Sequence, residues 1–146
     1  MDEIVARRRR MEILSLSPTG ELERIFNIFK LEKDPLVLRA PESGLIMARG
    51  RIAGTGSPFN LGELFLSRTA VSILGFVGYG YCLCQSPYHA YLAACLDSLA
   101  QNPSYAELVE KELSLLQLAR EKEIEKESRK TDKTKVEFFT LVRGDD

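Results

Sequence analysis

The sequence contains no tryptophan, a single histidine and only three cysteines in 146 residues. An odd, small number of cysteines excludes the disulfide framework of a small secreted domain and suits a reducing compartment. We therefore expect a cytoplasmic protein in which Cys82, Cys84 and Cys95 are reduced thiols. The one residue between Cys82 and Cys84 fits zinc-ligand spacing poorly, so no metal is expected. No recognisable motif pairs His89 with a serine or cysteine nucleophile.

Long apolar runs and an excess of one charge are also missing. No apolar stretch approaches the ~20 residues that a membrane span needs, and the start of the chain lacks the apolar core of a secretory signal. The 20 basic and 21 acidic residues give a net charge of −1, so no bulk field attracts nucleic acid or an acidic membrane. These absences predict no nucleic-acid and no membrane partner, and the length suits a single domain.

The strongest pattern that is present lies between Gly44 and Cys84. Apolar and polar side chains alternate along Leu45–Ile52 and again from Glu63 to Leu74, and the aromatic-rich segment Tyr79–Cys84 follows a glycine turn. Alternation with a period of two is typical of half-buried strands, because successive side chains point to opposite sides of the pleat. The connections are short, so the pattern predicts an antiparallel sheet.

Helical patterns flank this sheet on both sides. Ile4–Leu16 predicts a first helix, and Ser17–Pro18 predicts the cap and first position of a second helix. The proline that follows Ser86 predicts a third helix in the same way, and a fourth is expected from Tyr105 to about Lys130. The second half of this last helix is almost entirely charged, which indicates a solvated helix or one that lies along a partner.

The end of the chain returns to apolar residues after the hydrophilic linker Thr131–Lys135. Val136–Val142 predicts a strand, which needs a sheet edge of this chain or of another subunit. The predicted fold is therefore α+β, with an antiparallel sheet of four to five strands, two N-terminal helices, two C-terminal helices and a strand-like tail. The single domain 1–146 divides into segments 1–33 (helical), 36–84 (sheet, beginning with a strand at Leu36–Ala40 and a turn at Pro41–Gly44), 86–130 (helical) and 136–142 (strand). The expected partner interface comprises Phe138, Phe139, Leu141, Val142 and Arg143.

One group of residues predicts anion binding. Arginine forks and the backbone N–H groups of a glycine loop suit a polyphosphate or a phosphonate. The loop opens no helix and lacks the lysine and serine or threonine of a P-loop, so a wide hairpin with surface arginines is the alternative. If the loop does bind an anion, Arg51 and Arg68 are expected to converge on it. The candidate residues are Arg49, Arg51, Gly54, Thr55, Gly56 and Arg68.

Arg7–Arg10 form a run of four arginines on the predicted first helix. Such a run is compatible with a phosphate site, with a solvated turn or with a rim contact to an acidic partner. Specific phosphate sites usually add glycine, serine or a helix N-terminus to the charge. The sequence therefore favours the solvated turn or the rim contact.

Three blocks of the sequence resemble the G subunit family of the bacterial carbon–phosphorus lyase system. Together they span most of the chain from Arg39 onward. The third block is the most specific of them. The blocks are Arg39–Val71, with Arg39-Ala40-Pro41-Glu42-Ser43-Gly44 and Ala48-Arg49-Gly50-Arg51; Gly78–Leu99, with Gly78-Tyr79-Gly80-Tyr81 and His89-Ala90; and Val136–Asp145.

The resemblance implies a subunit of a complex for phosphonate utilisation. Its partners would be the H, I and J subunits, with the I subunit the direct partner, and functionally the ATP-binding L subunit. The complex would transfer an alkylphosphonate to the ribose of MgATP and release adenine. The resemblance carries no catalytic residue and no cofactor of this chain's own, so MgATP would be a substrate of the complex. The alternative function is a standalone anion-binding protein or small enzyme that uses the arginine–glycine loop.

Overall fold

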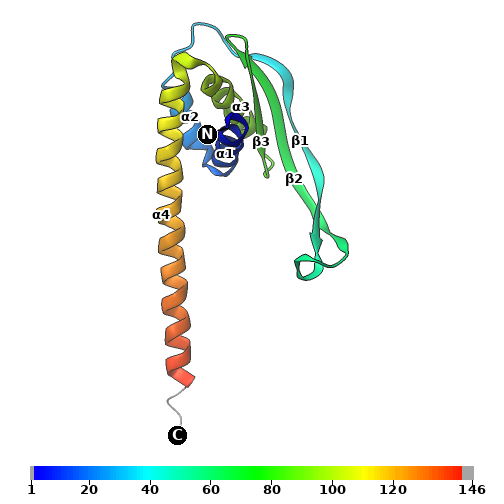
Figure 1. Ribbon diagram of the computed structural model, residues 1–146, viewed down its shortest axis with the longest axis vertical. Helices are drawn as coiled ribbons and strands as arrows, with labels where there is room; N and C mark the ends of the chain where they lie inside the picture. The colour runs from blue at the N-terminus through cyan, green and yellow to red at the C-terminus, as the bar shows by residue number, and fades with distance from the viewer. Residues whose placement is uncertain (1, 143–146) are drawn as a thin grey trace. The chain divides into compact units, whose positions relative to one another are not determined.

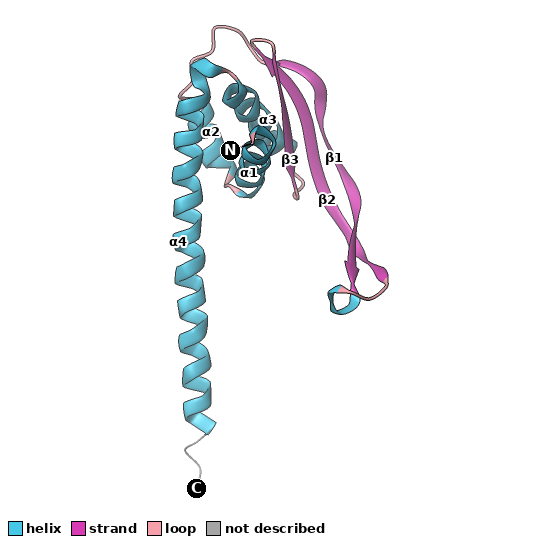
Figure 2. Ribbon diagram, viewed as in Figure 1, coloured by secondary structure: helices cyan, strands magenta, loops and turns pink. Residues whose placement is uncertain are grey.

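The structure, a computed structural model, describes residues 2–142, with side chains described as far as Thr134. It contains four α-helices and a three-stranded antiparallel sheet, which confirms the α+β class (Figures 1 and 2). The chain divides into two compact units, residues 1–113 and residues 114–146. The elements are α1 (Glu3–Leu16), α2 (Thr19–Phe26), β1 (Leu36–Arg51), the 3₁₀ turn η1 (Ile52–Gly54), β2 (Pro58–Ile73), β3 (Phe76–Cys82), α3 (Pro87–Gln101) and α4 (Pro103–Val142).

The sheet has the order β1-β2-β3, and its strand count of three is lower than predicted for a simple reason. The two segments Leu36–Ala40 and Leu45–Ile52 belong to one continuous strand, β1, rather than to two strands joined by a turn. Pro41 does not break β1, because β1 is an edge strand and its pairing with β2 is irregular between Arg39 and Glu42. A proline without an N–H is tolerated at such an edge irregularity.

The helix α3 forms the centre of the core of the first unit. Its residues from His89 to Ala100 are buried with the exception of Tyr91, so it is enclosed on nearly all sides rather than along one stripe. The predicted start is confirmed, since the Ser86 hydroxyl accepts a hydrogen bond from the His89 N–H and Pro87 opens the helix. Leu14, Leu22 and Leu113 bring buried side chains from α1, α2 and the first turns of α4.

Two glycines of β3 allow the strand to lie directly against α3. A Cβ atom at Gly78 would collide with the Ala94 carbonyl, and one at Gly80 would collide with the Ala90 carbonyl. Tyr79 and Tyr81 alternate with these glycines and point to the opposite, exposed face of the sheet. The small residues of α3 and the glycines of β3 therefore fix one helix–strand contact together.

The pair β1–β2 continues beyond the end of β3. The last pair of the β2–β3 ladder joins Ser67 to Cys82, whereas β1 and β2 remain paired as far as Arg51 and Pro58 (Figure 1). We call this two-stranded extension, residues 44–66, the arm. The strand predicted over Leu45–Ile52 is confirmed within β1, but no residue of the arm is buried, so the predicted burial of one face is wrong. Alternation reports the side to which a residue points and does not require that anything covers that side.

The C-terminal region differs from the prediction. The linker Thr131–Lys135 and the expected strand Val136–Val142 both continue the helix α4. The linker contains neither glycine nor proline, and lysine is a good helix former, so nothing ends the helix there. The side chains of Phe138, Phe139, Leu141 and Val142, and all of Arg143, lie outside the described residues.

Two further local predictions have clear outcomes. Ser17 does not cap α2; its hydroxyl donates 2.6 Å to the Ile13 carbonyl at the end of α1, and Pro18 is the N-cap of α2. The charged half of α4 is exposed from Leu118 to Thr134 and carries side-chain pairs one turn apart, such as Arg129 with Glu125 at 2.6 Å. Such pairs give only small stabilisation, as is normal for a solvated helix surface.

Candidate functional site

The structure does not bring the predicted anion-binding residues to one place. Arg51 lies at the tip of the arm, where it pairs with Pro58, whereas Arg68 lies near the base of the arm, where it pairs with Glu42 and Tyr81. At roughly 3.3 Å per residue, the two positions are about 33 Å apart along β2. The expectation that Arg51 and Arg68 converge on one anion is therefore wrong.

Arg68 has a local role in the sheet. Its Nε donates 2.8 Å to the Glu42 carboxylate on the neighbouring strand, and the Arg39 guanidinium lies 3.2 Å from the same carboxylate. All three side chains are about half exposed, so the cluster is a solvated cross-strand ion pair of modest strength. Arg68 thus forms an ion pair with a carboxylate of its own sheet.

The loop at the tip of the arm turns back on itself. The N–H groups of Thr55 and Gly56 both point to the Ile52 carbonyl, at 3.3 Å and 2.8 Å, and so are not directed to a ligand. A Cβ atom at Gly56 would lie 2.8 Å from that carbonyl, which explains the glycine. Gly54 adopts a positive φ of 78°. This geometry matches the hairpin alternative, and anion binding by the tip stays a prediction.

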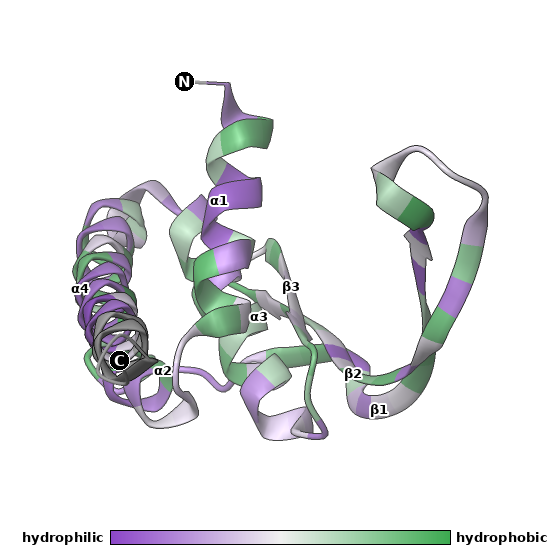
Figure 3. Cartoon of the chain, turned by 90° about the horizontal axis from the view of Figure 1, so that it is seen from below, coloured by the Kyte–Doolittle hydropathy of each residue, from purple (hydrophilic) through white to green (hydrophobic). Residues whose placement is uncertain are grey.

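The arm is apolar on both faces. Cross-strand partners share a face, so Leu45 and Phe65 lie on one side together with Met47, and Ile46 and Leu64 lie on the other. These five side chains are between 37% and 56% exposed. Figure 3 shows hydrophobic segments recurring along the arm out to its tip. An antiparallel strand pair in water normally has one polar face, so this pattern points to an interaction surface.

The charge of the arm is concentrated near its tip. Arg49 and Arg51 are exposed, and no ion pair is found for either of them within residues 2–134. The one hydrogen bond found there for Arg51 runs from its Nη1 to the Gly56 carbonyl at 3.4 Å. These two guanidiniums, unlike Arg68, are available to a carboxylate or another anion outside the chain.

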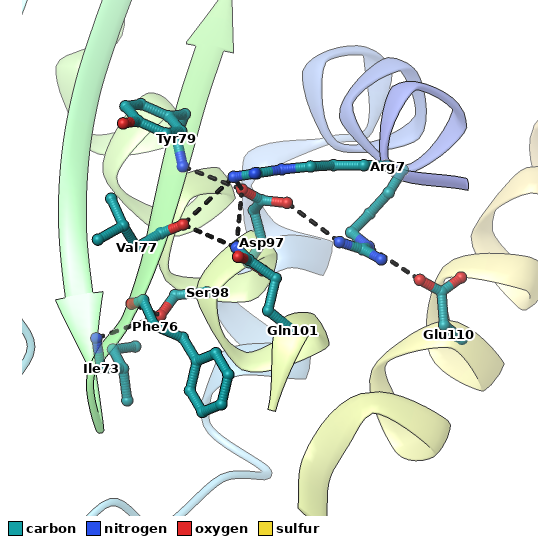
Figure 4. Close-up of polar contacts among 10 residues, drawn as sticks. Arg7, Ile73, Phe76, Val77, Tyr79, Asp97, Ser98, Gln101 and Glu110 are labelled. Carbon is teal, nitrogen blue, oxygen red and sulfur yellow. Dashed lines mark hydrogen bonds and ion pairs between the residues drawn. The ribbon is translucent and has the colours of Figure 1, made fainter. Parts of the chain in front are cut away.

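The four N-terminal arginines are divided between the core and the surface. Arg7 Nη2 lies 2.7 Å from Asp97 Oδ2 (Figure 4), and Arg10 Nη1 lies 3.2 Å from Asp97 Oδ1. Asp97 itself is fully buried. Arg10 Nε also donates 2.8 Å to Glu110. The prediction of a solvated or partner-facing run is wrong for Arg7 and Arg10, whose charges hold α1 against α3.

The Asp97 carboxylate also reaches the sheet. The Tyr79 N–H donates 3.0 Å to Asp97 Oδ2, and Arg7 donates 3.2 Å to the Val77 carbonyl. A buried carboxylate needs such compensation, and removing a partner from a buried ion pair costs about 3–5 kcal/mol. The sequence signal was present, because Asp97 is the one charged residue in the apolar span from Ala90 to Ala100. The partners of Asp97 lie far away in the sequence and could not be predicted from this local pattern.

His89 and the cysteines are structural. His89 is buried, with Nε2 2.9 Å from the Leu14 carbonyl and Nδ1 2.9 Å from the Thr19 hydroxyl. The carbonyl can only accept a hydrogen bond, so Nε2 donates it, and both ring nitrogens are engaged within the fold. The expectation of three reduced thiols is wrong, since Cys82 and Cys84 form a disulfide and only Cys95 is free. Their Cα atoms lie 5.3 Å apart, within the range that a disulfide spans.

The described part of the chain offers no evident catalytic centre. No cluster of three or more metal-ligating side chains occurs among the described residues. A surface cavity of about 560 Å³ is lined by a mixed set of charges, Lys30, Glu32, Lys33 and Asp34, together with Ser72, Tyr105 and the turn after β2. None of the described helices is long and apolar enough to cross a membrane.

Comparison with known proteins supplies the family. The profile of the family described as phosphonate metabolism protein PhnG matches residues 5–144. The chain belongs to the PhnG family. It is also 36% identical over 144 residues to alpha-D-ribose 1-methylphosphonate 5-triphosphate synthase subunit PhnG of Rhizobium meliloti (strain 1021), covering 98% of this chain and 92% of that relative. The resemblance of the three sequence blocks to this family is thereby confirmed.

Proposed function

We propose that this chain is a subunit of an alpha-D-ribose 1-methylphosphonate 5-triphosphate synthase. The observation that carries the proposal is the 36% identity with a relative of that name along 98% of the chain. In the proposed reaction, an alkylphosphonate attacks the ribose of MgATP and adenine leaves. The partners would be the H, I and J subunits, with the L subunit contributing functionally, in the cytoplasm.

The chain would serve this complex without an active site of its own. The polar side chains buried in the first unit, including Asp97, His89 and Arg10, are engaged with other parts of the same fold. The exposed features include the apolar arm, whose tip carries Arg49 and Arg51 without an ion pair among residues 2–134, and such a surface suits contacts with other polypeptides. This distribution supports an accessory role rather than a standalone anion-binding protein or small enzyme.

Reconstitution tests the proposal. The chain is expressed with the H, I, J and L polypeptides, and adenine release from MgATP and methylphosphonate is measured by chromatography. We expect release from the complete mixture, at least about 10-fold less when this chain is omitted, and none from the chain alone. Full activity without the chain, or adenine release by the chain alone, would contradict the proposal.

A further inference from the structure

We propose that the arm inserts into an apolar cleft of another polypeptide, with carboxylates at the inner end of the cleft that receive Arg49 and Arg51. This inference rests on the proposed function, because it requires a partner chain. It differs from the predicted C-terminal interface, since it concerns residues 44–66. Three features of the arm carry it, namely its two apolar faces, its open edges and the charge at its tip.

The first feature distinguishes insertion from contact with a flat surface. A flat partner surface covers one face of a strand pair and leaves the other in water. Here Leu45 and Met47 on one face are 56% and 50% exposed, and Ile46 and Leu64 on the other are 37% and 45% exposed. Both faces therefore carry apolar side chains whose burial against a partner would be favourable in free energy. A single partner covers both faces only if it surrounds the arm.

The second feature is the backbone. Beyond the Ser67–Cys82 pair, β2 has lost its neighbour β3, and β1 is the edge of the sheet along its whole length. Within the part of the chain that the structure describes, the arm thus presents N–H and C=O groups along both sides that no neighbouring strand pairs. A two-stranded ribbon of this kind is marginally stable by itself, and open edges attract further strands. A cleft whose walls offer backbone or polar groups would satisfy them.

The third feature selects a different polypeptide over a second copy of this chain. Side chains of β1 alternate, so Arg49 and Arg51 share the face of Leu45 and Met47. Glu63, paired with Met47, supplies the carboxylate of that face. In a two-fold dimer through this face, the two guanidiniums of each copy would meet those of the other copy, with only one carboxylate from each copy to balance them. A cleft with acidic residues at its inner end has complementary charge instead.

The test uses variants of each face in the full-length chain. Leu45→Asp/Met47→Asp alters one face, Ile46→Asp/Leu64→Asp alters the other, and Arg49→Glu/Arg51→Glu reverses the tip charge. Ile4→Asp/Val5→Asp is the matched control, since these residues are 76% and 54% exposed on α1, outside the arm. Each chain is purified by itself, and its affinity for the separately purified assembly of the H, I and J polypeptides is measured. Thermal unfolding verifies that each variant is folded, as expected for surface changes.

We expect each of the three arm variants to bind at least about 10-fold more weakly than the wild type, and the control to bind normally. Loss with only one of the two face variants would overturn insertion in favour of a flat contact. Normal binding by all arm variants would overturn the arm as an interface. A wild-type dimer that the face variants dissociate would assign the arm to a second copy and overturn the proposal. Failure of wild type and control to bind any partner would reject the proposed function itself, and with it this inference.

Discussion

Cys95 shows what burial does to a single ionisable residue in this fold. It lies in the middle of α3 with no exposed surface, while the other two cysteines are joined to each other. Burial raises the pKa of the Cys95 thiol to about 12, because the thiolate would lose its solvation, and a contact with Tyr91 offsets this only partly. Cys95 is therefore a packing residue and not a nucleophile at neutral pH.

This shift predicts a loss of stability in mild alkali. The unfolded thiol ionises near pH 9 and the folded thiol only near pH 12, so the unfolded state loses its proton first and gains stability as the pH rises. The free energy of unfolding should fall by at most about 1.4 kcal/mol per pH unit above pH 9. Urea unfolding at about pH 7.5 and pH 9.5 measures the change. The Cys95→Ala variant keeps Tyr91, and its free energy of unfolding should decline distinctly less between these two pH values. An equal decline in the variant would rule out ionisation of Cys95 as the cause.

At the scale of elements, the contact of α3 with β3 permits a direct test. Gly80→Ala would place a methyl group against the Ala90 carbonyl, so strand and helix would have to separate. We expect a destabilisation of about 2–3 kcal/mol, as for overpacking in a rigid core. The midpoint of urea unfolding reports it. Gly20→Ala on α2 is the control, since no atom beyond its chain neighbours and the backbone of its own helix lies within 4 Å of the added Cβ, and it should be neutral or stabilising. Equal effects of both substitutions would show that the contact does not limit stability.

Local patterns were sufficient to predict most elements but not how far they extend or what covers them. Ser86–Pro87 specified the start of α3, because capping depends on neighbouring residues. Pro41 suggested a turn, and only the edge position of β1 explains why it does not form one. The apolar residues Val136–Val142 suggested a strand, whereas the helix α4 continues through them.

The same limit applies to the candidate site. The arginines and glycines of the arm could be identified in the sequence, but the distance between Arg51 and Arg68 depends on the pairing of β1 with β2. The ion pairs of Arg7 and Arg10 depend on Asp97, which is 90 residues from Arg7 along the chain. Sequence patterns report local periodicity, and these contacts are made by the tertiary fold.

At the scale of the whole molecule, assembly is expected to depend on the C-terminal residues as well as on the arm. A chain that ends at Lys135 loses the apolar segment Val136–Val142, and we expect it to fail to co-purify with the H, I and J polypeptides. A chain that ends at Arg143 loses only Gly144-Asp145-Asp146 and is the control. Size-exclusion chromatography after affinity capture on the partner provides the measurement. Recovery of an intact complex from the shorter chain would show that this segment is dispensable for assembly.

The open edges of the arm have a consequence for the amounts in which this chain is made. Unpaired strand edges beside apolar side chains are templates for pairing with any other exposed strand, including that of an identical chain. A copy synthesised in excess of its partners is thus expected to aggregate or to be degraded by cellular quality control. Matched synthesis of the chain and its partners would keep the concentration of such unassembled copies low. Because the arm has open edges, the stability of this chain in the cell is expected to depend on synthesis in amounts that match its partners.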